Sequence, residues 1–251
     1  MPTALITGPT AGIGRAFADA YAGRGSDLVL VSRDAERLER VADEVGAAYG
    51  VECEVFPADL ADLDDVARVE ARIADAERPV EAVVNNAGYG IARWFQDTSV
   101  EEEQRSLDVL VRAPLRLSHA AVQAMLPRGS GEILNVSSVA GFLPRGTYGA
   151  HKAWVTSFTE WLNLTYRTKG IKATALCPGF VRTEFHTRGD MDMSSVPRWM
   201  WLDAESLVAQ AMRDLAAGKA ISIPSKRYAV LARVSRLAPR RIVARMARMG
   251  R

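Results

Sequence analysis

The sequence of 251 residues lacks several features that mark particular protein classes. It has no apolar run of about 18 residues, which excludes a membrane-spanning helix. The N-terminus lacks the basic segment and apolar stretch of a secretory signal. The only two cysteines, Cys53 and Cys177, lie in strand-like segments and do not form a disulfide framework. We therefore expect a cytoplasmic protein with buried, reduced thiols.

Internal repeats and flexible linkers are also absent, so nothing divides the chain into two folded domains. Three histidines, at positions 119, 151 and 186, do not have the spacing of metal ligands, and we expect no metal site. Hydrophobic residues at 48% and charged residues at 25% are typical of a folded protein. We expect one domain over residues 1–225, followed by an extension over residues 226–251.

Acidic residues are missing from the C-terminal end. From Lys219 to Arg251 there are ten Lys and Arg and no Asp or Glu, whereas the remainder carries 22 basic and 30 acidic residues. Apolar residues recur there at helical spacing, first at Val230, Leu231, Val234 and Leu237, then beyond Pro239 at Ile242, Val243, Met246 and Met249. This pattern predicts a basic amphipathic helix that contacts an anionic membrane surface. Packing on its own or a partner subunit stays open, and no motif indicates nucleic-acid binding.

Short apolar runs alternate with helical patterns along the chain. The predicted strands cover residues 4–6, 28–31, 55–56, 82–84, 132–136, 172–176 and 220–223, and helical patterns lie between them, including a long one over about 100–125. This alternation predicts an α/β fold, a single doubly wound Rossmann-type domain with a parallel seven-stranded sheet flanked by helices. Ligands of such sheets bind beyond the carboxyl ends of the strands.

A glycine-rich turn follows the first predicted strand. Gly8, Gly12 and Gly14 let the backbone approach a ligand closely, and the next helix directs free N–H groups at a pyrophosphate. After the second strand comes Arg33, a residue that suits the 2′-phosphate of NADP(H), with Arg15 expected nearby. Asp34 is interpreted as a helix N-cap, the alternative being a ribose ligand that would favour NAD(H). We therefore predict NADP(H), with NAD(H) as the less favoured cofactor.

Asp59 follows the third strand, where an adenine contact and a structural turn carboxylate are both open. Asn86 and Gly88, with Asn85 before them, close the fourth strand as a compact corner that would line the same site.

A tyrosine and a lysine share one face of a later helix. Tyr148 and Lys152 are four residues apart, so the ammonium is expected to stabilise a tyrosinate and lower the pKa of the phenol. Tyr148 would then be a general acid and base for an alcohol or carbonyl. Ser138, at the end of the fifth strand, is expected to bind and orient the substrate oxygen.

These motifs, in this order, resemble the short-chain dehydrogenase/reductase family over about residues 3–183. The resemblance is carried by Thr7-Gly8-xxx-Gly12-Ile13-Gly14, Asn85-Asn86-Ala87-Gly88, Asn135-Val136-Ser137-Ser138, Tyr148-xxx-Lys152 and Pro178-Gly179. It implies a catalytic Rossmann domain over residues 1–225 with a Ser138, Tyr148 and Lys152 centre. The residues then expected to contact the cofactor are Thr7, Gly8, Thr10, Gly12, Ile13, Gly14, Arg15, Arg33, Asp59, Leu60, Asn86, Ala87, Gly88, Tyr148, Lys152, Pro178, Gly179, Val181 and Thr183.

Two departures from the family pattern stand out. An asparagine that usually supports a water near the lysine is replaced by Leu110, unless the register is shifted and Asp108 takes part. The interval between Ser138 and Tyr148 is also short, which predicts a tight loop over residues 141–146. Neither departure removes the serine, tyrosine or lysine.

Substrate specificity is expected to come from loop 89–95 and from a lid over residues 180–202. The lid is rich in apolar side chains, namely Phe185, Met191, Met193, Trp199, Met200 and Trp201, with His186 at its rim. A simple core-covering helix is the alternative. We predict hydride transfer between NADP(H) and a lipophilic or bulky secondary alcohol or ketone. The rival is a non-catalytic NADP(H) sensor or membrane-surface scaffold with the same fold.

The family resemblance further implies a homodimer or homotetramer formed through two long helices, the one predicted over about residues 100–125 and a second that begins near Tyr148 and ends before Gly170. Trp154, Phe158 and Trp161 are candidates for that interface, and core packing explains them equally well.

Overall fold

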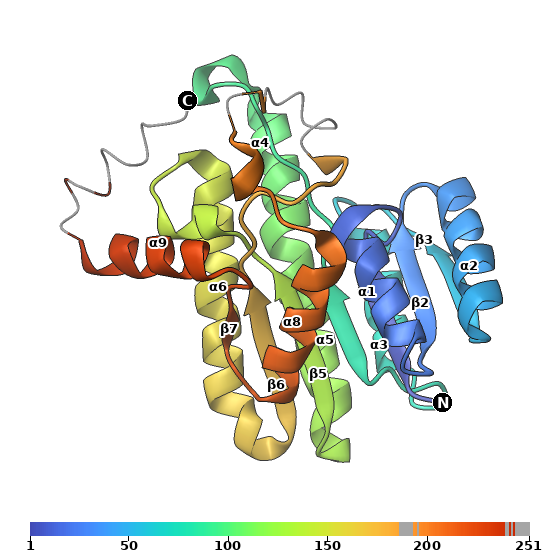
Figure 1. Ribbon diagram of the computed structural model, residues 1–251. Helices are drawn as coiled ribbons and strands as arrows, with labels where there is room; N and C mark the ends of the chain where they lie inside the picture. Colours follow the sequence, from blue (N-terminus) through green and yellow to red (C-terminus); the bar gives the residue numbers. More distant parts are fainter. Residues whose placement is uncertain (186–192, 195, 239–240, 242, 244–251) are drawn as a thin grey trace.

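Seven parallel strands form one sheet in the computed structural model, which describes residues 1–185, 193–194, 196–238, 241 and 243 (Figure 1). The strands lie in the order β3-β2-β1-β4-β5-β6-β7. Strands β2 and β3 are added on one side of β1 and strands β4 to β7 on the other, so the topological switch point lies between β1 and β4. Their bounds are β1 (Thr3–Thr7), β2 (Asp27–Ser32), β3 (Cys53–Pro57), β4 (Ala82–Asn85), β5 (Gly131–Val136), β6 (Ile171–Leu176) and β7 (Ile221–Ser222). The doubly wound sheet expected from the sequence is confirmed.

Helices cover both faces of this sheet (Figure 1). One face packs against α1 (Gly12–Ala22), α2 (Ala35–Tyr49) and α8 (Ala204–Ala216). The other packs against α3 (Leu63–Ala74), α5 (Ala113–Met125) and α6 (Gly146–Tyr166). The central strands are buried on both sides, as the unbroken apolar runs of β1 and β2 require.

Helix ends follow the capping rules. Asp34 is the N-cap of α2, because its side chain accepts a hydrogen bond from the Arg37 backbone N–H at 3.0 Å. The N-cap interpretation of Asp34 is therefore confirmed. Ser99 and Glu102 form a reciprocal capping box at the start of α4 (Val100–Leu107).

The long helix predicted over residues 100–125 is present but not uniform. Between α4 and α5 lies a π-helical turn, η2 (Asp108–Arg112), which accommodates one extra residue in the helical path. Such turns often mark functional positions. This one carries Leu110, and the residue lies over the centre of the sheet's carboxyl edge.

The C-terminal part of the chain adds helix α9 (Lys226–Leu237) beyond β7. It projects from the edge of the sheet in Figure 1. Within the described residues, no helix has the length and apolarity needed to cross a bilayer. Neither Cys53, which is half-buried, nor Cys177, which is buried, forms a disulfide.

Candidate active site

The glycine-rich turn lies between β1 and α1 at the carboxyl edge of the sheet. Gly8 and Gly12 have φ angles of +67° and +57°, which side chains rarely adopt. A Cβ on Gly14 would lie 2.1 Å from the Gly8 carbonyl oxygen, so only glycine fits there. The backbone of the turn is therefore not covered by side chains of its own on the side that faces the cavity.

The end of β4 braces this turn. The Asn86 side-chain amide donates to the carbonyl oxygens of Thr7 and Gly8, at 2.9 and 3.0 Å. The Thr7 hydroxyl in turn accepts from the backbone N–H groups of Asn86 and Ala87, both at 3.0 Å. Thr7 and Asn86 thus hold the turn and the β4 corner as one unit.

A cavity of about 1020 Å³ extends across the carboxyl edge of the sheet from this turn. Most residues predicted to contact a cofactor line it, and so do two of the three predicted catalytic residues. The lining includes Gly8, Thr10, Gly12, Ile13, Arg33, Asp59, Leu60, Asn86, Ala87, Gly88, Tyr148, Lys152, Pro178, Gly179, Val181 and Thr183. Residues up to about 175 positions apart in the sequence are therefore brought together by the topology.

Thr7, Gly14, Arg15 and Ser138 are not part of that lining. Thr7 and Gly14 support the turn from behind, as described above. Arg15 pairs with Asp19 at 3.2 Å and with Glu44, which directs its guanidinium toward helices α1 and α2. Ser138 meets the site through Tyr148 rather than through the cavity wall.

At one end of the cavity, Arg33 is exposed and has no ion pair or hydrogen bond with any residue that the structure describes. Asp59, opposite, is occupied: Oδ1 accepts from the Ala61 backbone N–H at 3.0 Å and Oδ2 from Arg105 at 2.6 Å. Burial raises the pKa of Asp59, but these donors outweigh it and the net direction is downward. The turn role of Asp59 is confirmed, and an adenine contact stays a prediction.

Two residues that sequence reasoning missed close over the same end. Arg37, in the first turn of α2, lies 3.2 Å from Glu184 at the start of the lid. Both line the cavity. The lid also touches the glycine turn, since a Cβ on Gly12 would lie 2.6 Å from the Thr183 methyl carbon.

At the other end lie Tyr148 and Lys152, on successive turns of α6. A side-chain hydrogen bond joins Tyr148 to Ser138. The Lys152 ammonium lies 5.7 Å from the centroid of the Tyr148 ring and donates to the Val136 carbonyl oxygen at 2.7 Å. The three residues predicted to form the catalytic centre are therefore adjacent in space.

Burial dominates the protonation of this pair. It raises the pKa of Tyr148 to about 12, against a lowering from the hydrogen bond with Ser138. It also lowers the pKa of Lys152 to about 8, against a small opposite effect of Cys177. The direction for Tyr148 is opposite to the expected one, because desolvation of the phenol exceeds any stabilisation by the lysine.

Helix α6 is fixed against β5 by buried polar side chains, some of which belong to the motifs quoted above. The Ser137 hydroxyl donates to the Lys152 carbonyl oxygen at 2.7 Å and bonds Thr156 at 2.7 Å. Below them, Asn135 accepts from Asn85 at 2.8 Å and donates to Thr159 at 2.8 Å. These buried contacts set the height of Tyr148 and Lys152 above the sheet.

Leu110 occupies the position inferred for it beside the lysine. A Cβ on Gly88 would lie 2.8 Å from a Leu110 methyl carbon and 3.9 Å from the Lys152 ammonium. Asp108, the alternative, faces elsewhere: it accepts from Gln104 and pairs with Arg112 at 2.9 Å. The leucine side chain offers neither a donor nor an acceptor, so any proton path from Lys152 uses other groups.

The shortened segment after Ser138 is tight, as expected. It forms the turn η4 (Val139–Phe142), which Ser138 caps by accepting from the Ala140 N–H at 3.1 Å. A Cβ on Gly141 would lie 2.8 Å from the backbone of Lys152 and Ala153. The segment therefore lies directly on the backbone of α6.

Phe185, an aromatic residue of the segment expected to form the lid, lines the cavity. The Phe185 ring lies 6.0 Å from the Tyr148 ring, and Phe180 lies 5.9 Å from Trp201. Met193, Met200 and Trp199 are also described, whereas His186 and Met191 lie outside the described residues. The apolar character expected of the lid holds for the residues that are described.

Helix α9 is joined to this lid. The Tyr228 hydroxyl accepts from the Phe180 N–H at 3.2 Å and donates to the Met200 carbonyl oxygen at 2.9 Å. Its ring fills the space beside Gly179, where a Cβ would lie 2.1 Å from a ring carbon. One buried tyrosine from the basic extension thus ties together the two ends of the lid. No local sequence signal indicates this contact.

Comparison with known proteins agrees with this architecture. A family model described as short chain dehydrogenase matches residues 2–193, and the chain belongs to that family. Over 191 residues it is 35% identical to the very-long-chain 3-oxoacyl-CoA reductase of Anas platyrhynchos. The match covers 72% of this chain and 60% of the duck protein, so this chain spans less than two thirds of that relative.

Solved structures of similar proteins cover nearly the whole chain. A short-chain dehydrogenase of Sphingobium yanoikuyae in complex with NADPH has a TM-score of 0.86 and 33% identity, over 94% of both chains. The bulky-bulky ketone specific alcohol dehydrogenase of Comamonas testosteroni has a TM-score of 0.81 and 31% identity, over 94% and 92%. A Burkholderia phymatum relative in complex with NAD has a TM-score of 0.79 and 26% identity, over 93% and 92%.

Within the described residues, no group of three or more His, Cys, Asp or Glu side chains could hold a metal ion. The candidate site therefore combines a backbone cradle, the exposed Arg33 and the group of Ser138, Tyr148 and Lys152.

Proposed function

We propose that this short-chain dehydrogenase transfers a hydride between NADP(H) and a lipophilic or bulky secondary alcohol or ketone. The observation that carries the proposal is the hydrogen bond of Tyr148 to Ser138, on a wall of the cavity that also contains the glycine turn. A phenol and an alcohol so joined can bind one carbonyl oxygen between them.

The residues present fit a dinucleotide. A Cβ at Gly14 would collide with the cradle, and Gly8 and Gly12 expose their backbone at positive φ. The N-terminus of α1 directs its free N–H groups and partial positive charge at the same space. The cavity of about 1020 Å³ has room for a ligand of that size together with a substrate.

NADP(H) is favoured over NAD(H) by Arg33. This guanidinium lines the cavity where the second strand ends, and it forms no ion pair with any described residue. The carboxylate beside it, Asp34, is occupied as a helix cap. A free arginine suits a 2′-phosphate, whereas an unoccupied acid would suit a 2′-hydroxyl.

When bound, the nicotinamide supplies or accepts the hydride. Tyr148 donates its proton to the carbonyl oxygen of the substrate as negative charge develops there. A pKa of about 12 keeps this phenol protonated at neutral pH, which suits the direction of reduction. Ser138 donates to the same oxygen and orients it. Lys152, held by Val136, places a positive charge under the phenol as it becomes a phenolate.

The substrate class rests on the lid. Phe185 lines the cavity and lies against Tyr148, so aromatic surface adjoins the candidate catalytic residues, and Phe180 and Trp201 add a second aromatic pair to the same segment. A bulky apolar ketone gains most from such a lining. The names of the Comamonas and duck relatives point to substrates of that kind.

A homodimer or homotetramer through the long helices is part of the proposal. On α6 the rings of Trp154, Phe158 and Trp161 stack at 4.7 and 6.0 Å. Phe158 packs against the core, whereas Trp161 is 52% exposed. Core packing thus accounts for Phe158, and an interface would account for Trp161.

The test is NADPH oxidation with aliphatic, aromatic and steroid-like ketones. Tyr148→Phe should lower turnover by about 10²-fold or more while NADPH still quenches tryptophan fluorescence with the wild-type affinity. Retained turnover in this variant would remove Tyr148 from the mechanism.

A second function is favoured by one observation. Leu110 leaves the surroundings of Lys152 without a polar side chain from the long helix, which suits a protein that binds NADP(H) without turning substrate over. In that case the wild type would bind NADPH and leave every ketone of the panel unreduced.

A further inference from the structure

Helix α9 has two faces of different character. Tyr228, Ala232 and Ser235 are buried on the side that faces the body of the protein. On the other side, Val230, Val234 and Leu237 are 61%, 44% and 85% exposed. Their spacing of four and three residues places them along one line of the helix. We call these three residues the α9 stripe.

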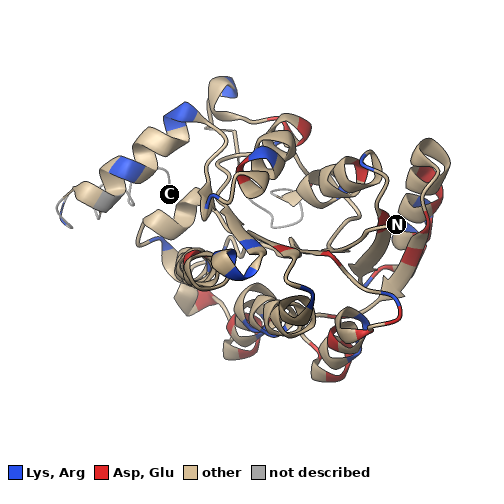
Figure 2. Ribbon diagram, turned by 90° about the horizontal axis from the view of Figure 1, so that it is seen from below, with Lys and Arg blue, Asp and Glu red and all other residues tan. Residues whose placement is uncertain are grey.

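Positive charge flanks the α9 stripe. At about 100° per residue, Arg227 lies about 60° to one side of Val230 and Arg233 about 60° to the other. Lys226 falls within the same arc, and Arg241 is exposed beyond the helix. There is no Asp or Glu from residue 219 to the end of the sequence. Figure 2 accordingly shows blue and no red along this helix.

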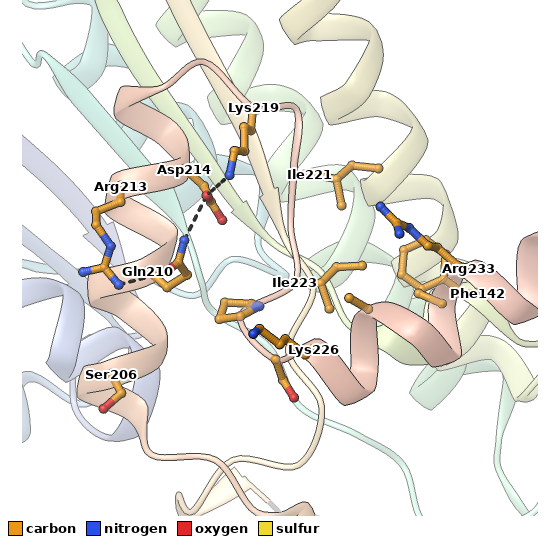
Figure 3. Close-up of a pocket in the computed structure, with 14 residues that line it drawn as sticks. Phe142, Ser206, Gln210, Arg213, Asp214, Lys219, Ile221, Ile223, Lys226 and Arg233 are labelled. Carbon is orange, nitrogen blue, oxygen red and sulfur yellow. Dashed lines mark hydrogen bonds and ion pairs between the residues drawn. The ribbon is translucent and has the colours of Figure 1, made fainter.

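A groove of about 650 Å³ between α8 and α9 extends the charged surface (Figure 3). Arg213, Lys219, Lys226 and Arg233 line it above a floor that includes Ile221 and Ile223. Its single acid, Asp214, is paired with Lys219 at 2.6 Å and also accepts a hydrogen bond from Ser222 at 2.7 Å. The groove is therefore left with a net positive charge directly beside the exposed apolar stripe.

The same helix holds the lid of the candidate active site. Arg227 lies over the ring of Trp199 at 5.3 Å and donates to the Trp199 carbonyl oxygen. Trp199 is 60% exposed, and the next residue on α9, Tyr228, binds both ends of the lid. Whatever contacts the α9 stripe thus lies close to the entrance for substrate.

We propose that the α9 stripe, with the cations that flank it and line the groove, docks on the surface of an anionic lipid bilayer. Val230, Val234 and Leu237 enter the boundary between headgroups and acyl chains, while Arg227 and Arg233 bind anionic headgroups. A second copy of the helix is a poorer occupant, because a two-fold contact would bring these like charges together. Docking of this kind presents the lid to the phase in which lipophilic ketones dissolve.

Co-sedimentation of the full chain with vesicles tests the surface without any need for turnover. The wild type should sediment with phosphatidylglycerol-containing vesicles, and little with pure phosphatidylcholine or at high salt. Val230→Asp with Leu237→Asp should reduce partitioning at least about tenfold. Leu63→Asp is the matched control, since Leu63 is 49% exposed at the start of α3, outside both α9 and the long helices proposed as the oligomer interface, and this variant should sediment like the wild type.

Two further readouts identify other occupants. If the double variant lowers Tm, or halves the mass measured by light scattering, the α9 stripe is covered by protein and lipid docking is wrong. Equal sedimentation of wild type, double variant and control would also overturn the proposal. NADPH oxidation in vesicle-free buffer should be unchanged in the double variant, so failure of docking and failure of the proposed reaction are distinguishable.

Discussion

Lys152 should make the folded protein less stable than it would be with an apolar residue in its place. The side chain is 5% exposed, and burial lowers its pKa from 10.5 to about 8. That shift corresponds to about 3 kcal/mol at neutral pH. Replacing Lys152 with Met removes this penalty but leaves the Val136 carbonyl without its partner, which costs about 1 kcal/mol. Lys152→Met should therefore be about 2 kcal/mol more stable at pH 7, or about 4–8 °C in Tm.

The pH dependence gives this prediction its sign. Between pH 8 and 10.5 the unfolded chain still binds the lysine proton and the folded chain does not, so the wild type becomes more stable as pH rises. Lys152→Met has no such pH-dependent gain. The excess of its free energy of unfolding over that of the wild type should therefore decrease by about 2 kcal/mol between pH 7 and 9.5. Urea unfolding of both proteins at the two pH values measures it.

A control separates this effect from a general effect of removing a lysine. Lys172 also donates to a backbone carbonyl, that of Ala216 at 3.0 Å, but near the surface. Lys172→Met should change the unfolding free energy little, and by the same amount at both pH values. The reasoning is wrong if Lys152→Met is less stable than the wild type at pH 7, or if the difference does not vary with pH.

Two further predictions concern binding. Arg33→Ala should weaken the binding of NADPH by about 10–100-fold, because a charge-assisted contact is lost, and should hardly change the binding of NADH. The control is Arg40→Ala: Arg40 pairs with Glu36 outside the cavity, so the affinities for both cofactors, measured by fluorescence titration, should be unchanged. Equal weakening of both cofactors would contradict the role of Arg33. Tyr228→Phe removes two hydrogen bonds and should lower the free energy of unfolding by about 2 kcal/mol. It should also raise KM for a bulky ketone while the affinity for NADPH is retained. Tyr21→Phe, equally buried, should lower stability without touching KM, and the same KM in both variants would show that the lid does not depend on Tyr228.

The fold could be predicted because its signals are local. Apolar runs and helical periodicity alternate along the chain, and the parallel sheet is the arrangement that buries such runs on both faces. The positions of the glycine turn at Gly8 and Gly14 and of the pair of Tyr148 and Lys152 could also be predicted, because they are encoded in short spacings. Asp34 was interpreted correctly from its position directly before a helical pattern.

What the sequence did not indicate depends on contacts between distant residues. The pKa of Tyr148 is set by how completely the fold buries the phenol, a quantity that no spacing contains. The contact of Ser137 with the backbone of Lys152 requires the exact height of α6 over β5. Tyr228 and Phe180 are 48 positions apart, and nothing near either residue indicates the other.

The contact between Gly179 and the Tyr228 ring has a consequence for protein engineering. Because the sequence predicts a domain over residues 1–225 and an extension over residues 226–251, a truncation after residue 225 would be the obvious choice for a shortened protein. Such a truncation would remove the aromatic wedge that supports the Pro178-Gly179 loop and leave an open gap beneath it. Removal of the extension should therefore weaken ligand binding in the cavity, and a useful shortened form must end after the last residue of α9.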